Sequence, residues 1–286
     1  MISALPLPPE IEKGLREARR VLIATDFDGT LCPIAERPSK VQLAPAMQDI
    51  LSRAAVSQSL TVAVISGRAV SDLQSRLPLD LLFSGNHGLQ VVGRGLSFVH
   101  QGARQLRFSL SGACETLART LRSWPGAWIE NKGLSATLHF REVEECHHHA
   151  LLLAAGQALG TLNRHLDLSV GKQALEIRPN VHWDKGSALR YIQNEAGPFD
   201  VCICLGDDRT DEDMFRANRG QFNVGIGTSK LTAITHVLSD AGEVAVLLSK
   251  IVELRGWSRH SHVAACAVAA RTSAMGGSAT AHDDGV

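Results

Sequence analysis

Residues 21–30 read VLIATDFDGT, an apolar run that ends abruptly at Asp26, with a second carboxylate two positions later at Asp28. The run shows no alternation of apolar and polar residues, which is typical of a strand buried on both faces. The same pattern, an apolar run that ends at a polar residue, recurs at Ser66, Ser84 and Asp207. Such strands predict an α/β fold built on a Rossmann-like, doubly wound parallel sheet.

Helical segments separate these runs, so the chain alternates between strands and helices. In open parallel sheets, ligands bind beyond the carboxyl ends of the strands. Asp26, Ser66 and Asp207 all fall at such ends, and we therefore expect three distant segments to meet at one site. We expect helices at residues 9–20, 45–57, 69–77, 186–194 and 210–217.

The pattern changes between residues 105 and 179. Residues 134–140 alternate apolar and polar side chains, which predicts an antiparallel strand with one polar face. Helical patterns at 111–123 and 147–162, with a second hairpin at 166–179, complete an α+β unit. We expect this unit to be an insert that interrupts the parallel sheet, with its polar face over the site.

The expected organisation is a discontinuous core domain with a smaller inserted α+β cap domain. The end of the chain is rich in Ala, Ser, Gly and His and shows little periodicity, so we expect a flexible tail. The predicted boundaries are residues 1–104 for the first part of the core, 105–179 for the cap, 180–258 for the second part of the core and 259–286 for the tail.

Composition limits the classes of partner. The 286 residues carry 29 basic and 29 acidic side chains, so neither a nucleic acid nor a membrane surface is an expected partner. The chain has no apolar run of about 18 residues and no secretory signal, and we expect a cytoplasmic monomer acting on a small molecule. Its six cysteines lack metal or disulfide spacing, so we expect reduced, buried thiols.

Two acidic clusters indicate a metal site. Two carboxylates at the end of a buried strand are costly unless a cation holds them, and the segment after residue 206 adds further carboxylates. Few carboxylates with room for water and phosphate oxygens suit Mg²⁺ better than zinc. One acidic turn alone would be weak evidence, but two clusters at equivalent strand ends favour a site. The acidic residues are Asp26, Asp28, Asp207, Asp208 and Asp211.

The same residue types can perform phosphoryl transfer. The spacing lets Asp26 act as a nucleophile and Asp28 as a general acid and base. A hydroxyl and main-chain amides in the stretch from Ser66 through Gly67 to Arg68, which opens a helix, could bind an anion. Lys185 could neutralise a transferring phosphoryl group. Taken singly, the serine-glycine pair is also an ordinary turn, and a lysine at a helix start is usually solvated.

In combination, these residues resemble a known superfamily. The motifs Asp26-x-Asp-Gly-Thr, Ser66, Lys185 and Gly-Asp207-Asp-x-x-Asp211 are similar to those of haloacid dehalogenase-like (HAD) phosphohydrolases. Within that superfamily, longer strings resemble the trehalose-6-phosphate phosphatases over about residues 21–248. The strings are DFDGTLCPIAERP, SGR, GNHGLQ, IENKGLSATLHFR, LEIRP and GDDRTDEDMF.

The resemblance implies a HAD fold and a reaction. Trehalose 6-phosphate would be hydrolysed to trehalose and phosphate, the last step of trehalose biosynthesis. Asp26 would attack phosphorus and form an aspartyl-phosphate, while Asp28 would protonate the departing sugar oxygen and later activate water. Ser66 and Lys185 would hold the phosphoryl oxygens.

The resemblance also implies a ligand set for Mg²⁺. The side chains of Asp26 and Asp207 and the main-chain carbonyl of Asp28 would bind the ion. Asp211 or Asp208 would support it through water, and Asp208 is also a candidate substrate ligand.

Sugar-binding positions are implied mainly on the cap. Carboxylates accept hydrogen bonds from sugar hydroxyls and ammonium groups donate to them, which makes such residues reasonable ligands. Without the resemblance, Glu and Lys in hairpin turns would be interpreted as solvated. The matching positions are Glu130, Lys132, Lys172 and Glu176, with His87 from the core.

Three alternatives stay open at this point. The substrate could be another sugar phosphate, such as sucrose phosphate or mannosylphosphoglycerate. The protein could be a sensor that binds a sugar phosphate without hydrolysis, although its acidic motifs are intact. A phosphomutase would share the aspartyl-phosphate and pass the phosphoryl group back to sugar.

Overall fold

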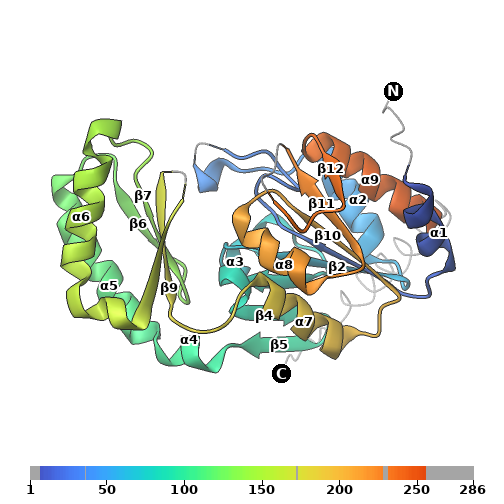
Figure 1. Cartoon of the computed structure of the whole chain (residues 1–286), viewed down its shortest axis with the longest axis horizontal. Helices are drawn as coiled ribbons and strands as arrows, with labels where there is room; N and C mark the ends of the chain where they lie inside the picture. Colours follow the sequence, from blue (N-terminus) through green and yellow to red (C-terminus); the bar gives the residue numbers. More distant parts are fainter. Residues whose placement is uncertain (1–6, 36, 172, 228–230, 256–286) are drawn as a thin grey trace, which may run out of the picture.

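The computed structural model describes residues 7–35, 37–171, 173–227 and 231–255 (Figure 1). The tail expected at residues 259–286 and the candidate Lys172 lie outside the described residues. Within the described part of the chain, no helix is long and apolar enough to cross a membrane.

The larger part of the structure is built on an eight-stranded sheet, with β1 (Val21–Thr25) at its centre. β1 pairs in parallel with β10 (Val201–Gly206) on one side and with β2 (Leu60–Ile65) on the other. Alternate residues of β1 join two separate apolar clusters, one on each face of the sheet. The doubly wound parallel sheet predicted from residues 21–30 is therefore confirmed.

The strand order in this sheet is β12-β11-β10-β1-β2-β3-β4-β5. Its remaining strands are β3 (Leu82–Gly85), β4 (Gln90–Gly93), β5 (Leu96–Val99), β11 (Phe222–Ile226) and β12 (His236–Leu238). The helices of this part are α1 (Pro9–Glu17), α2 (Pro45–Ala55), α3 (Val70–Arg76), α7 (Lys185–Ala196), α8 (Glu212–Ala217) and α9 (Ala241–Leu254).

One edge of the sheet differs from the prediction. β4 and β5 run antiparallel, as a hairpin that extends the parallel strands. The turn consists of Arg94 (φ 47°) and Gly95 (φ 84°), and two positive φ angles in a two-residue turn match the twist of paired strands. The Gly-Arg-Gly stretch carries this turn signal in the sequence.

A second, smaller unit forms the cap (Figure 1). Its antiparallel sheet has the order β6-β7-β9-β8, and α5 (Arg107–Thr120) and α6 (His148–Leu159) pack on its apolar face. This order of helices and strands confirms the inserted α+β unit. Its strands are β6 (Trp128–Asn131), β7 (Ala136–His139), β8 (Leu166–Val170) and β9 (Ala174–Pro179).

The chain passes between core and cap twice, through α4 (Gln101–Gln105) and after β9. Leu89, Ala103 and Leu134 form a small apolar cluster at this junction. The short 3₁₀ turns are η1 (Pro38–Lys40), η2 (Asn86–Gly88), η3 (Leu121–Ser123), η4 (Glu145–His147), η5 (Gly160–His165) and η6 (Arg209–Asp211).

Candidate active site

Three carboxylates meet at the carboxyl ends of β1 and β10. Asp26 follows β1, Asp207 follows β10, and Asp211 ends η6. Each offers one oxygen, and these oxygens all lie within 4.8 Å of one another. Lys185, the first residue of α7, donates from Nζ to one oxygen of Asp26 and one of Asp211, both at 2.7 Å. The parallel pairing of β1 and β10 thus brings together residues that lie far apart in the sequence.

The electrostatics of this cluster favour a further cation. Burial raises the pKa of Asp26 well above its usual value, and the charges of Asp211 and Asp207 raise it further although Lys185 lowers it. Burial and the charge of Asp211 raise the pKa of Asp207 to about 7. Asp207 Oδ1 is buried and has no hydrogen-bond partner among the described residues. Three carboxylates beside one ammonium group, with a free buried oxygen, fit a divalent cation that prefers oxygen ligands.

Asp211 organises the turn that carries Asp207. Its Oδ2 accepts the main-chain N–H groups of Asp207 and Asp208, both at 3.0 Å. A Cβ at Gly206 would overlap the Asp211 carboxyl carbon, so the close approach requires glycine there. The exposed Asp208 side chain accepts from the N–H of Arg209 and caps η6, outside the group of three carboxylates.

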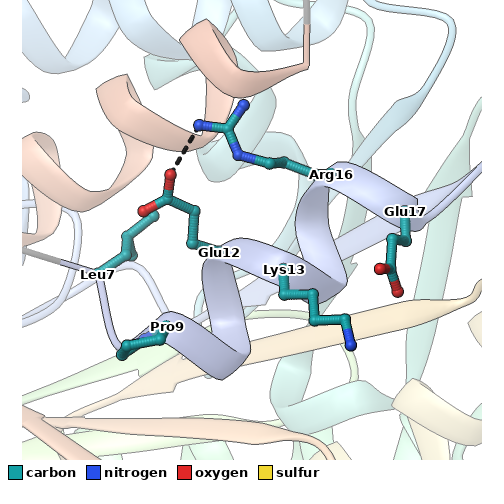
Figure 2. Close-up of a pocket in the computed structure, with 6 residues that line it drawn as sticks. All are labelled: Leu7, Pro9, Glu12, Lys13, Arg16 and Glu17. Carbon is teal, nitrogen blue, oxygen red and sulfur yellow. Dashed lines mark hydrogen bonds and ion pairs between the residues drawn. The ribbon is translucent and has the colours of Figure 1, made fainter.

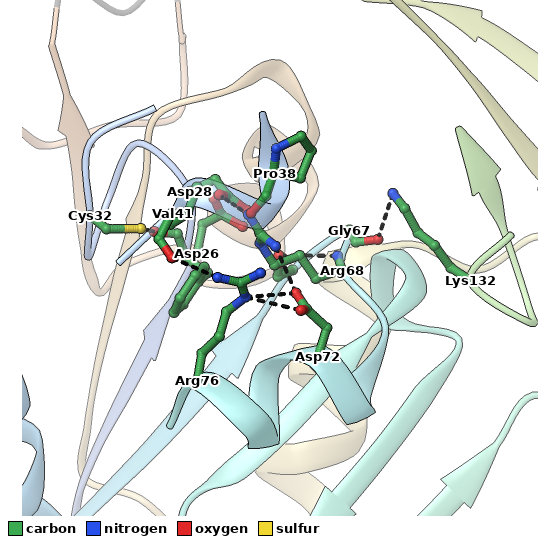
Figure 3. Close-up of polar contacts among 12 residues, drawn as sticks. Asp26, Asp28, Cys32, Pro38, Val41, Gly67, Arg68, Asp72, Arg76 and Lys132 are labelled. Atoms are coloured by element: carbon green, nitrogen blue, oxygen red, sulfur yellow. Dashed lines mark hydrogen bonds and ion pairs between the residues drawn. The ribbon is translucent and has the colours of Figure 1, made fainter. Parts of the chain in front are cut away.

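Asp28 lies in a separate polar network with Arg68 (Figure 3). The buried Arg68 donates from Nε and Nη2 to the two oxygens of Asp28, at 2.6 and 2.7 Å. Its Nη1 donates to Asp72 at 2.6 Å, and Arg76 binds the same carboxylate. The predicted substrate ligand Arg68 is thus engaged by the protein's own carboxylates. Sequence reasoning missed Asp72 and Arg76, which the four-residue spacing from Arg68 could have indicated.

Ser66 and Gly67 follow β2 at the same edge of the sheet. The buried Ser66 accepts from the N–H of Arg68 at 3.2 Å. A Cβ at Gly67 would lie 2.6 Å from the ring of His87, so a larger residue there would displace that ring. The Gly67 carbonyl accepts from Lys132 Nζ of the cap at 3.2 Å, as Figure 3 shows. This edge of the core sheet therefore contacts the cap.

Glu176 is the most fully bound carboxylate on the polar face of the cap. It accepts from Thr137 Oγ1 at 3.0 Å, and its other oxygen lies 3.3 Å from His87 Nε2 and 3.9 Å from Lys132 Nζ. Burial opposes its ionisation, but these neighbours outweigh burial and bring the pKa of Glu176 to about 2. Burial lowers the pKa of His87, so its ring is uncharged near neutral pH and Nε2–H donates to the carboxylate.

Glu130 has a different partner, which sequence reasoning did not assign to the site. His139 Nε2 lies 2.9 Å from Glu130 Oε2, and the imidazole stacks on Trp128 with ring centroids 4.1 Å apart. A buried hydrogen bond from Ser135 Oγ to Asn86 Oδ1, at 2.8 Å, also joins cap and core. The first pairing depends on the register of β6 with β7 and the second on the packing of cap against core, so residue spacing alone could not indicate them.

A second group of potential metal ligands lies on the cap. Glu144, Cys146 and His147 approach one another around η4, and all three are exposed. The prediction of buried thiols is therefore wrong for Cys146, because the short turn points it to solvent. Cys32, Cys114, Cys202 and Cys204 are buried, and Cys266 lies outside the described residues.

Two hollows occur away from the carboxylate cluster. One, of about 360 Å³, lies along α1 and contains none of the predicted site residues (Figure 2). Its main polar feature is the hydrogen bond from Arg16 to Glu12 at 2.7 Å. The other, of about 410 Å³, lies at the junction of core and cap and includes His87 and Arg178 in its lining. His87, one of the predicted sugar ligands, therefore lines the second hollow.

Known proteins share this arrangement of sequence and fold. The family model described as trehalose-phosphatase matches residues 24–242, which include both parts of the core and the whole cap. The chain belongs to the trehalose-phosphatase family. Its members among the curated proteins include a probable trehalose-phosphate phosphatase 4 of Oryza sativa subsp. japonica, 33% identical over 91% of this chain and 72% of that protein. Trehalose-phosphate phosphatase B of Arabidopsis thaliana is 31% identical over 90% of this chain and 72% of its own length.

Solved structures of similar proteins share the fold of this chain. The C-terminal domain of a C. albicans trehalose-6-phosphate phosphatase superposes with a TM-score of 0.73 at 22% identity, covering 86% of this chain and 96% of that domain. A trehalose-6-phosphate phosphatase related protein gives a TM-score of 0.72 at 25% identity, covering 82% of this chain and 97% of its own. Core and cap are both included in matches of this extent.

Proposed function

We propose that this protein is a magnesium-dependent phosphatase that hydrolyses trehalose 6-phosphate to trehalose and phosphate. The observation that carries the proposal is the buried cluster of Asp26, Asp207, Asp211 and Lys185 at the carboxyl end of the central strand. Membership of the trehalose-phosphatase family supports the choice of substrate. The polar face of the cap, in contact with the core at Gly67 and His87, supports a site completed by both domains.

Phosphoryl transfer would use Asp26 and Asp28 in turn. A carboxylate oxygen of Asp26 attacks phosphorus while the bond from phosphorus to the sugar oxygen breaks, and Asp28 gives that oxygen its proton. Asp28 then takes a proton from water, whose oxygen attacks the aspartyl-phosphate and releases phosphate and free Asp26. Ser66 and Lys185 hold phosphoryl oxygens, and the paired guanidinium of Arg68 orients Asp28.

Residues at the acidic cluster would hold Mg²⁺. Asp26 and Asp207 would bind through their side chains and Asp28 through its main-chain carbonyl. Asp211 would act in support, because Lys185 and two main-chain amides already occupy its oxygens. When bound, the ion supplies positive charge that reduces the repulsion between the negatively charged ester and the carboxylate of Asp26.

The cap would recognise the sugar. Glu130, Lys132 and Glu176, with His87 from the core, would hydrogen-bond the hydroxyl groups. We propose residues 105–179 as the unit that determines specificity, with residues 1–104 and 180–258 as the unit that performs the reaction. We propose that the enzyme acts as a monomer, since one chain carries every group named here, and that it acts in the cytoplasm.

The test is phosphate release from a panel of esters, with Mg²⁺ and with a chelator. The panel contains trehalose 6-phosphate, sucrose 6-phosphate, mannosylphosphoglycerate and para-nitrophenyl phosphate. We expect the highest kcat/KM for trehalose 6-phosphate and loss of turnover with the chelator. Preference for another sugar phosphate would contradict the substrate assignment, and binding without phosphate release would identify a sensor.

A further inference from the structure

The pairing of β6 with β7 places three side chains together on the polar face of the cap. Trp128 lies directly opposite His139, and Glu130 lies opposite Thr137. Residues two apart on a strand point to the same face, so Trp128 and Glu130 share a face with His139. His139 and Glu130 are diagonal neighbours, a separation that long side chains can bridge.

Two contacts fix the imidazole of His139. Its Nε2 lies 2.9 Å from Glu130 Oε2, and its ring stacks on Trp128 with an interplanar angle of 18°. The His139 side chain is 17% exposed, compared with 34% for Glu130. His139 is therefore more buried than the carboxylate that it binds. This is expected of a residue that holds a sugar-binding side chain in place without contacting the sugar.

Glu130 depends on this one partner more than Glu176 depends on any of its own. Glu176 has a hydroxyl, an imidazole and an ammonium group around its two oxygens. Among the described residues, the Glu130 side chain has a hydrogen bond to His139 alone. Burial raises the pKa of Glu130, but the hydrogen bond from His139 and the charge of Lys132 outweigh burial and lower it. Glu130 is therefore an ionised acceptor, oriented through Oε2.

We propose that His139 is a positioning residue for sugar recognition, which holds Glu130 Oε2 so that Oε1 is directed to a sugar hydroxyl. This inference rests on the proposed function in taking Glu130 as a sugar ligand. His139 itself makes no contact with the reacting phosphoryl group in this scheme. A glutamate without its support samples several rotamers, and a displaced ligand weakens binding of the sugar without altering the chemistry at phosphorus.

The experiment compares H139A, H139Q, E130Q and the double variant E130Q/H139A in the full chain. Kinetics are measured with trehalose 6-phosphate and with para-nitrophenyl phosphate, which has no sugar. For H139A we expect an increase of about tenfold in KM for trehalose 6-phosphate, and unchanged kcat/KM for the small ester. H139Q retains a side-chain N–H donor and should recover most of the loss. The double variant should be no worse than E130Q, since His139 acts through Glu130.

H148A is the matched control. His148 is also a cap histidine, with its Nε2 2.8 Å from the Val143 carbonyl and its ring against Phe140, but it lies at the start of α6. The H148A substitution should leave KM for trehalose 6-phosphate unchanged. Unfolding midpoints of all variants then separate loss of structure from loss of positioning.

Several outcomes would overturn the inference. An unchanged KM in H139A, equal losses on both esters, or additive effects in the double variant would each exclude positioning through Glu130. Failure of the wild-type protein to hydrolyse trehalose 6-phosphate would instead remove the proposed function. If the wild type hydrolyses it and E130Q has no effect, Glu130 is not a sugar ligand and the positioning role fails while the proposed function stands.

Discussion

At the residue scale, neighbouring carboxylates differ in what holds them. Asp26 shares Lys185 with Asp211, whereas both oxygens of Asp28 accept from the guanidinium of Arg68. Asp28 is 34% exposed, while Asp26 is buried. Two aspartates separated by one phenylalanine can thus take separate roles, one among buried charges and one nearer to solvent.

Substitution D26N tests the proposed nucleophile. An amide cannot form the aspartyl-phosphate, so we expect turnover of every ester to fall by at least about 10³-fold. The fold should persist, because the change removes a buried negative charge and keeps the shape of the side chain. Phosphate release and the unfolding midpoint measure the two effects. D49N is the control, at an exposed residue paired with Arg53 on α2, and should leave both unchanged. Turnover retained in D26N would exclude Asp26 as nucleophile.

Gly29 offers a second test at this scale. It has a φ of 79°, and a Cβ there would overlap Asp207 Oδ2. Gly95, at φ 84°, has open space around its Cβ position. Both alanine substitutions carry a backbone cost of about 1 kcal/mol, but only G29A should displace Asp207. We expect urea unfolding to show greater destabilisation for G29A than for G95A, and a loss of turnover in G29A alone. Equal effects would show that the contact with Asp207 is unimportant.

At the element scale, hydrophobic pattern predicted most of the architecture. Unbroken apolar runs at β1, β2 and β10 indicated buried parallel strands, and alternation at residues 134–140 indicated the antiparallel β7. The β4–β5 hairpin was not predicted, because its strands have only four residues each and neither is a continuous apolar run. At the candidate site, strand ends predicted that Asp26 and Asp207 would approach each other. The pairing of His139 with Glu130 follows from register between strands, which residue spacing does not contain.

The cap face provides a prediction about elements. E176A removes the carboxylate that β9 presents beside Thr137 and His87. We expect kcat/KM for trehalose 6-phosphate to fall by about 100-fold, since unmatched hydrogen bonds to a buried sugar are costly. Turnover of para-nitrophenyl phosphate should change little. E115A, at an exposed position of α5 in the same unit, serves as control. Equal losses on both esters would place Glu176 outside sugar recognition.

At the scale of the whole molecule, a few polar contacts join core and cap. Arg37 binds Glu142 at 2.6 Å on the outside, where both side chains are about half exposed. Lys132 and Glu176 make contacts to Gly67 and His87 in more buried surroundings. Exposed ion pairs contribute little to stability, so the inner contacts should contribute more to the packing of cap against core.

Glu176 makes this arrangement sensitive to acid. Its pKa is about 2 in the folded protein and about 4.3 when unfolded, so the unfolded chain binds more protons between those values. The stabilisation is complete above about pH 5 and is lost as the pH falls towards 2. We expect the difference in unfolding free energy between wild type and E176Q to shrink over this range, by at most about 3 kcal/mol. Urea titrations at stepped pH measure it, and a constant difference would contradict the prediction.

The interruption of the core by the cap has a consequence for protein synthesis. β1 emerges from the ribosome early, but β10, which covers one of its edges, begins at Val201 after the whole cap has been made. A chain that ended just before that residue would contain the whole cap but leave one edge of β1 open and apolar, the kind of surface that aggregates or recruits chaperones. Translation must therefore pass residue 206 before the molecule can bury its own centre.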